Sequence, residues 1–204
     1  MYPKRVPAPL RLPLGTMTWR IPSAKKEVFL TFDDGPTPEI TLAVLDILDE
    51  YGAKATFFGI GKNVDENPEI WQAVQDRGHS IGHHSYTHVN GWKTDLMEYI
   101  EDVHKAAKVI KSRLFRPPYG RISPRKAKAL SKNYMIIMWT VLSGDFDQNI
   151  DGEQCTSNVL SALKPGDIVV FHDSVKAWPR LKEALPKVLY YIQEKGWKAD
   201  KLPQ

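Results

Sequence analysis

Two adjacent carboxylates, Asp33 and Asp34, follow the short apolar run Val28–Phe32 and precede a Gly-Pro pair. A short apolar run bounded by turn residues is typical of a buried strand, so both acids are expected at the strand's C-terminal end. In α/β folds this is the edge where sites form. Because two unpaired buried carboxylates are costly, we expect a metal, a cation or water opposite them.

Histidines follow a second predicted extended segment, residues 80–85, where His84 and His88 stand four residues apart. This spacing suits two imidazoles on one metal if the backbone turns helically there. One carboxylate of the 33–34 pair would complete a three-ligand set and leave a position for water. Such a site is hydrolytic, because the metal makes bound water acidic enough to ionise near neutral pH. We expect His79 and His104 to lie outside it.

Further polar residues end other predicted strands. Arg116 and Tyr119 lie in an extended piece and turn at residues 115–120, residues 143–147 follow the strand predicted at 135–141, and His172-Asp173 follows the strand at 167–171. In a parallel α/β barrel these strand ends share one face, so the side chains are expected to converge.

The elements that must position these residues alternate along the chain. Strands separated by helical segments predict parallel β-α-β units, in either a doubly wound sheet or a barrel, and the even composition predicts a single domain. Strands are predicted at residues 28–32, 55–60, 80–85, 135–141, 167–171 and 196–202. Helices are predicted from 39 to about 51, at 69–77, about 94–114, from 124, at 153–163 and at 181–195.

Composition narrows the class of protein. The 204 residues suit one domain, and a hydrophobic content of 42% with 25% charged residues is ordinary for a globular chain. The single cysteine, Cys155, excludes an internal disulfide framework and a cysteine-rich metal site, and we expect it to be a packing residue. The net charge of +4 is scattered. Because no phosphate loop, zinc-finger spacing or basic-aromatic run is present, nucleic-acid binding is not predicted.

Residues 1–26 contain five prolines and no apolar core of signal-peptide length. They are expected to form an irregular arm over the catalytic domain, residues 27–204, with Trp19 and Ile21 as its anchors. Because these residues have no long apolar core, we expect neither a signal peptide nor stable membrane insertion.

Four sequence blocks together resemble a known family. They occur in the family's order and are Thr31–Pro36, His84–His88, Arg116–Tyr119 and Val169–His172. They are similar to the signature blocks of the polysaccharide deacetylases, the NodB-homology group or carbohydrate esterase family 4. The resemblance implies a distorted (β/α)7 barrel of parallel strands. It also implies a divalent metal, most often zinc with cobalt, nickel or manganese as alternatives, and hydrolysis of an N-acetyl group on a glycan amino sugar.

The resemblance also implies roles for residues at matching positions. Asp34, His84 and His88 become the metal ligands. Asp33 becomes the general base that takes a proton from the attacking water, and Arg116 is expected to pair with Asp33.

Two further roles follow from the resemblance. The Tyr119 backbone N–H would join the metal in stabilising the oxyanion, which suits a tetrahedral intermediate that carries a negative oxygen. His172 would protonate the departing amine, since an amide nitrogen leaves poorly unless it is protonated.

One family block departs from the usual pattern. Leu142 stands in place of an acid, and Phe146 stands in place of a tryptophan as a wall of the substrate site. Asp145 matches the acid expected to pair with His172, and Asp147 is a rival for that role. These departures leave the substrate preference open.

Several alternatives therefore stay open at this point. They are an O-acetyl esterase on xylan-type glycans, a deformylase or deacetylase of a lipid-linked sugar, and a non-catalytic glycan-binding relative. Trp92 and Trp178 either stack on a sugar or pack against the protein. The arm's composition favours the cytoplasm and the substrate class favours the cell envelope, and oligomeric state is not predicted.

Overall fold

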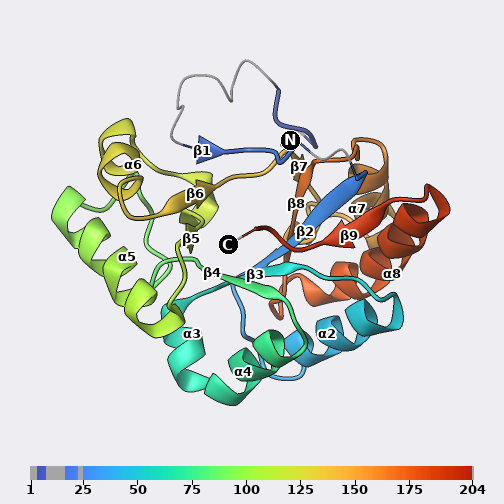
Figure 1. Cartoon of the computed structure of the whole chain (residues 1–204), viewed down its shortest axis with the longest axis horizontal. Helices are drawn as coiled ribbons and strands as arrows, with labels where there is room; N and C mark the ends of the chain where they lie inside the picture. The colour runs from blue at the N-terminus through green and yellow to red at the C-terminus, as the bar shows by residue number, and fades with distance from the viewer. Residues whose placement is uncertain (1–3, 8–16, 23–24, 204) are drawn as a thin grey trace.

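A curled sheet forms the centre of the molecule, with helices along its outside (Figure 1). The computed structural model describes residues 4–7, 17–22 and 25–203. Their strands pair in parallel in the order β1-β6-β5-β4-β3-β2-β8-β7, with β9 also against β2. The bounds are β1 Met17–Thr18, β2 Glu27–Asp33, β3 Thr56–Gly59, β4 Ser80–His83, β5 Leu114–Phe115, β6 Met135–Ile137, β7 Val141–Leu142, β8 Ile168–His172 and β9 Lys198–Asp200.

Helices connect most successive strands from β2 onward in the described chain, whereas β6 leads directly into β7. The helices are α2 Ile40–Glu50, α3 Gly61–Glu66, α4 Pro68–Asp76, α5 Leu96–Ile110, α6 Pro124–Leu130, α7 Gly152–Leu160, α8 Trp178–Glu194 and the 3-10 turn η1 Pro118–Gly120. The alternation and the curled sheet confirm the predicted fold, a distorted (β/α)7 barrel in a single domain. No helix among the described residues combines the length and apolar character needed to cross a membrane.

Strand β2 lies between β3 and β8 and divides its side chains between two apolar regions. Val28, Leu30 and Phe32 pack into the cluster that the outer helices complete. Phe29 packs with Phe58 in a separate interior cluster. Since side chains alternate along a strand, Thr31 and Asp33 share the face of Phe29. The strand therefore directs Asp33 to the interior of the curled sheet.

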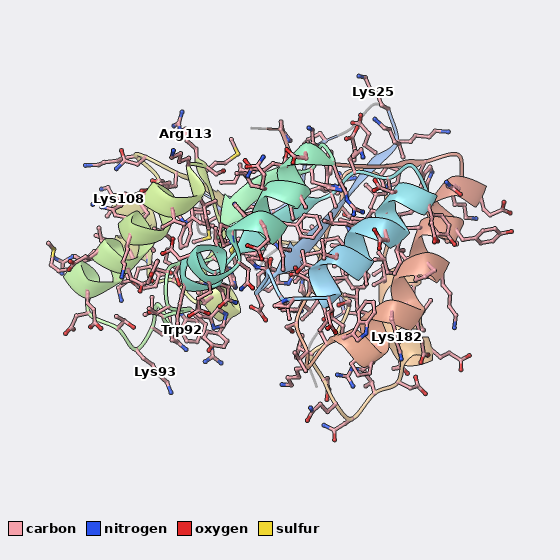
Figure 2. The ribbon with its side chains drawn as sticks, turned by 90° about the horizontal axis from the view of Figure 1, so that it is seen from below. Lys25, Trp92, Lys93, Lys108, Arg113 and Lys182 are labelled. Carbon is pink, nitrogen blue, oxygen red and sulfur yellow. The ribbon has the colours of Figure 1, made fainter. Side chains whose placement is uncertain are left out.

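The parallel register brings the carboxyl ends of the strands to one edge. Asp33 is paired with His172 of β8 and with Phe58 of β3, and His83 of β4 is paired with Phe115 of β5. Figure 2 shows the two edges: Lys25 and Arg113, which precede strands, lie at one edge, and Trp92, which follows β4, lies at the other.

Predicted and observed bounds differ by up to a few residues, and two predicted elements differ the most. The predicted strand 135–141 is divided into β6 and β7, because β6 pairs with β5 and β1 whereas β7 pairs with β8. The predicted helix 94–114 ends at Ile110, because Lys111 adopts a left-handed conformation with φ of 53°. Leu114 then begins β5. Helix α3 was not predicted.

The N-terminal arm contributes to the sheet where it is described. Met17–Thr18 forms β1 beside β6, where the sequence predicts irregular backbone. Trp19 and Ile21, the predicted anchors, pack against interior clusters. Arg5 and Arg20 pair with the fully buried Asp167.

Candidate active site

The side chains of Asp34, His84 and His88 meet at the carboxyl edge of the sheet. Their candidate ligand atoms all lie within 4.8 Å of one another. Asp34 Oδ1 is 3.4 Å from His88 Nε2 and 3.9 Å from His84 Nε2. Tetrahedral zinc with ordinary bond lengths needs ligand atoms about 3.3–3.5 Å apart. The 3.4 Å separation lies in this range and the 3.9 Å separation is longer. The donor set, two imidazoles and one carboxylate, suits zinc or a similar divalent cation.

Both imidazoles are prepared to act as ligands. His84 Nδ1 lies 2.8 Å from the Arg116 carbonyl oxygen, which only accepts, so Nδ1 donates and the Nε2 lone pair faces Asp34. His88 Nδ1 lies 3.1 Å from the Tyr119 hydroxyl. Burial lowers the pKa of His84 well below 6.5 and also lowers the pKa of His88. The neutral imidazole that results is the form that binds metal.

The backbone around these residues is not helical. Positive φ values of 83° at Asp34, 62° at Ser85, 59° at His88 and 60° at Tyr119 occur together at this edge. Non-glycine residues adopt such angles at a cost and tend to do so at functional sites. Left-handed residues, rather than the helical turn considered from the His84–His88 spacing, bring the two histidines together. Asp102 on α5 steadies their loop by accepting backbone N–H groups.

Asp33 is held in the interior by Arg116. Arg116 Nη1 donates to Asp33 Oδ1 at 2.6 Å and to the Thr31 hydroxyl at 2.7 Å. The guanidinium is fully buried over the Phe58 ring. Its remaining nitrogens donate to the carbonyls of Ile137, the last residue of β6, and Met138. Asp33 Oδ2 is turned toward the triad, 4.0 Å from His84 Nε2. One carboxylate oxygen of Asp33 therefore binds the Arg116 guanidinium, while the other faces the triad.

His172 and Asp145 form a second pair at the same edge. Asp145 Oδ1 lies 2.8 Å from His172 Nδ1, and Asp145 Oδ2 accepts the His172 backbone N–H. Burial alone lowers the pKa of His172, but Asp145, with further contributions from Asp34 and Asp33, raises it to about 10. At neutral pH the His172 imidazole is therefore protonated. Phe146 packs edge-on against it, with ring centroids 5.4 Å apart.

The chain is similar to known proteins over most of its length. The family model described as "Polysaccharide deacetylase" matches residues 20–136, more than half of the chain. A peptidoglycan-N-acetylglucosamine deacetylase of Bacillus cereus is 34% identical over 91% of this chain and 91% of its own length.

The chain belongs to the polysaccharide deacetylase family.

Two further proteins, one curated relative and one solved structure, are similar to this chain. A chitooligosaccharide deacetylase of Bradyrhizobium is 31% identical over 89% of this chain and 91% of its own. A solved peptidoglycan N-acetylglucosamine deacetylase, in complex with 4-naphthalen-1-yl-N-oxidanyl-benzamide, superposes with a TM-score of 0.89. That structure is 31% identical and covers 97% of this chain and 95% of its own. The similarity therefore extends beyond the matched family model to residues that follow 136.

The structure of this polysaccharide deacetylase shows which of two aspartates, Asp145 or Asp147, contacts His172. Asp145 contacts His172, whereas the Asp147 carboxylate accepts the backbone and side-chain N–H groups of Asn149. Leu142, which replaces a family acid, is half-buried in β7 and pairs with Val170. Tyr119 lies over His88, with ring centroids 4.6 Å apart.

Several supporting residues were missed from the sequence. Asp173 accepts the Gly35 N–H at 3.1 Å and the Thr41 hydroxyl at 2.6 Å. Burial raises the pKa of Asp173 to about 7, and the Thr41 hydrogen bond opposes this rise. Asn63 donates to the Asp34 carbonyl. Arg180 donates to the Asp145 carbonyl. The only sequence signal was that Asp173 adjoins His172; the others lie on helices with no motif.

Two histidines and a tryptophan lie away from the site. His83 stacks on Phe115, and burial lowers the pKa of His83 to about 3. His79 is buried against Phe57. Trp178 is partly buried and packs against the main core, whereas Trp92 is exposed. Packing is therefore the role of Trp178.

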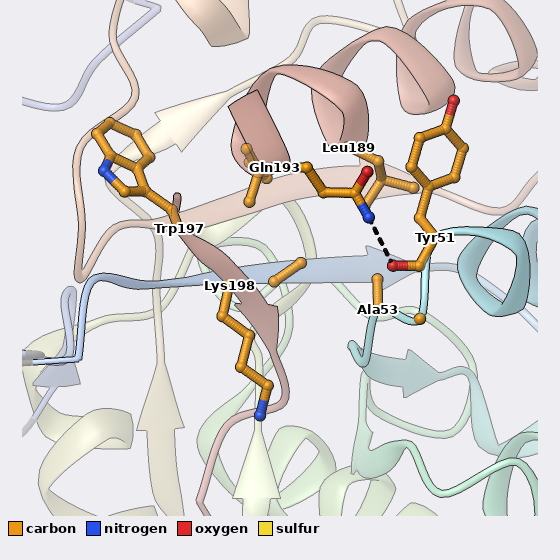
Figure 3. A pocket seen from close by; sticks show the side chains of 9 residues that line it. Tyr51, Ala53, Leu189, Gln193, Trp197 and Lys198 are labelled. Carbon is orange, nitrogen blue, oxygen red and sulfur yellow. Dashed lines mark hydrogen bonds between the residues drawn. The ribbon is translucent and has the colours of Figure 1, made fainter. Parts of the chain in front are cut away.

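A separate cavity of about 140 Å³ lies between α8, β9 and the turn after α2 (Figure 3). Gln193 donates across it to the Tyr51 carbonyl at 3.0 Å. The lining residue Lys198 is paired with Asp200 at 2.5 Å. None of the candidate site residues lines this cavity, so we assign it no part in the candidate chemistry.

Proposed function

We propose that this protein is a divalent-metal-dependent hydrolase that removes N-acetyl groups from amino sugars of a peptidoglycan-type or chitin-type glycan. The observation that carries the proposal is the meeting of three groups at one edge: the Asp34–His84–His88 triad, the Asp33–Arg116 pair and the His172–Asp145 pair. Family membership and the names of the relatives support the substrate class.

The triad is proposed to hold the metal. A divalent cation there would supply Lewis acidity, which acidifies water and polarises the acetyl carbonyl. The chain's contribution is to keep His84 and His88 neutral and oriented through their Nδ1 contacts.

Asp33 is proposed as the general base. Its Oδ1 is occupied by Arg116, so its Oδ2 accepts the proton of the water that attacks the acetyl carbon. The buried guanidinium stays in place while Asp33 changes charge, which keeps the acceptor oxygen fixed.

His172 is proposed as the general acid. Asp145 holds its Nδ1–H and raises its pKa, so Nε2 donates a proton to the amine nitrogen as the C–N bond breaks. Acetate and the free amino sugar are the products. Among the described residues the Tyr119 N–H has no hydrogen-bond acceptor, while the next two N–H groups donate to Pro117 and Pro118. It is free to stabilise the developing oxyanion.

The test compares the native protein with His84→Ala and Asp34→Ala on N-acetylglucosamine oligomers and peptidoglycan. We expect both substitutions to abolish stoichiometric zinc binding, measured by atomic absorption, and acetate release. Chelation of the native protein should do the same, with recovery on adding zinc. Full activity in a metal-stripped sample that added metal does not increase would contradict the mechanism.

A second comparison separates amide from ester hydrolysis. Since an ester leaving group needs less protonation than an amine, His172→Ala should slow deacetylation of N-acetylglucosamine oligomers far more than that of acetylated xylan. Equal losses on both substrates would remove His172 from the role of acid.

A further inference from the structure

An exposed arginine, Arg121, lies close to two aromatic rings, one of which packs against the triad residue His88. The Arg121 guanidinium carbon is 5.2 Å from the Trp92 ring centroid and 5.9 Å from that of Tyr119. Trp92 is 66% exposed and Tyr119 is 58% exposed. Because Tyr119 packs against the triad residue His88, these three residues form a surface that runs outward from the site, here called the arginine ridge.

The backbone fixes the ridge in place. Gly91, next to Trp92, forms a parallel bridge with Ile122, next to Arg121. A Cβ at Gly91 would collide with the Arg121 carbonyl oxygen, so only glycine permits this approach. The buried Lys126 donates to the Gly91 carbonyl at 2.8 Å and to the Thr94 carbonyl. Trp92 therefore lies in a turn whose two ends, Gly91 and Thr94, are both hydrogen-bonded to Lys126.

The charge of Arg121 has no protein partner in the described chain. No carboxylate of these residues forms an ion pair with it, and its side-chain N–H groups donate to none of them. Arg116 and Arg77, in contrast, contact carboxylates at 2.6 Å and 2.5 Å. Stacked aromatic rings cover the face of a guanidinium and leave its edge donors available. That edge matches a carboxylate in a bidentate geometry.

We propose that the arginine ridge binds a carboxylate on the sugar that neighbours the deacetylated residue. This inference rests on the proposed function and specifies its substrate: an N-acetylated glycan that carries acidic groups, such as a strand with lactyl carboxylates, rather than a neutral chitin-type chain. Trp92 supplies an exposed ring face for the sugar, and Arg121 supplies the charge that selects the acid.

The test uses oligosaccharides of alternating N-acetylglucosamine and N-acetylmuramic acid, and the same oligosaccharides with the lactyl carboxyl reduced to an alcohol. We expect native kcat/KM to be about fivefold higher for the acidic form, the size of an exposed charge pair, through a lower KM. Arg121→Gln should bring this ratio close to one. Trp92→Ala should lower it in the same direction, because the guanidinium loses its stacking partner.

Arg113→Gln is the matched control, because Arg113 is exposed, carries the same charge and lies at the opposite edge (Figure 2). It should leave the ratio as in the native protein. A native ratio near one, or equal changes in Arg121→Gln and Arg113→Gln, would overturn the inference while leaving deacetylation intact. If the native protein releases no acetate from either glycan, the proposed function fails. Calorimetric dissociation constants for the same glycans then give the ratio directly.

Discussion

Asp33 and Asp34 are neighbours in the chain and face different partners. Asp33 ends β2 and shares its interior face with Thr31, where Arg116 takes one carboxylate oxygen. Asp34 leaves the strand with a positive φ of 83°, which directs its carboxylate to His84 and His88. A change of backbone conformation between adjacent residues thus separates the proposed base from the proposed metal ligand.

Asp33→Asn tests this division. The amide oxygen still accepts from Arg116 and the triad is untouched, so zinc content should remain at the native level. Turnover should fall by roughly 10²–10⁴-fold, because an amide is no proton acceptor. Zinc stoichiometry and kcat for acetate release are the measurements, and a near-native rate would exclude Asp33 as the base.

Asp145→Asn tests the acid pair through pH. Asp145 raises the pKa of His172, so if His172 is the acid we expect activity to fall only above that pKa. Removing the charge lowers the pKa, so the alkaline limb of kcat/KM should move to lower pH. Asp147→Asn serves as the control, since Asp147 contacts Asn149 instead. A limb that stays in place after Asp145→Asn would contradict the assignment.

At the scale of elements, β8 and α2 jointly hold the loop that carries Asp34. Asp173, just after β8, accepts from Gly35 and from Thr41 on α2, and Thr41 also accepts the Thr37 N–H. The Asp173 N–H in turn donates to the Asp33 carbonyl. This hydrogen-bond network restrains the turn that carries Asp34, the proposed metal ligand.

Asp173→Ala should therefore weaken zinc affinity, by roughly 10–100-fold as for other residues that support metal ligands. Thr41→Val should act in the same direction, and Thr41→Ser, which keeps the hydroxyl, should restore affinity. Dissociation constants come from competition with a chelator. A lower melting temperature of the metal-free protein with unchanged zinc affinity would show that the network only stabilises the fold.

At the scale of the molecule, the N-terminal arm is attached by charge as well as by strand pairing. Arg5 and Arg20 reach the same fully buried carboxylate of Asp167, at 2.5 Å and 3.4 Å, and the Lys164 N–H adds a third donor. The arm therefore neutralises an acid that lies at the start of β8, the strand that ends in His172.

Replacing both Arg5 and Arg20 by alanine should lower the free energy of unfolding by about 1–3 kcal/mol, because the buried carboxylate loses its cations. Urea unfolding gives the value. Arg125→Ala, an exposed arginine with no carboxylate partner among the described residues, should change it little. Equal stability in the double variant would show that the strand pairing of β1 alone attaches the arm.

The sequence by itself determined the fold class and indicated most of the residues that meet at the candidate site. Apolar runs before Asp33 and His172, and an extended segment that contains His84, predicted strands with polar ends. This inference holds because strand alternation and turn residues are local properties. Four blocks in order indicated the family. The ligand, base and acid roles remain predictions that rest on those blocks and on the geometry that now accompanies them.

Tertiary structure decided what depends on contacts between distant segments. The pairing of Asp145 rather than Asp147 with His172 follows from the parallel neighbours β7 and β8. The division of residues 135–141 depends on which strand lies beside each half. Arg121 and Trp92 meet only because Gly91 bridges to Ile122. Local sequence sets which way a side chain faces, but the packing of separate β-α units sets what it faces.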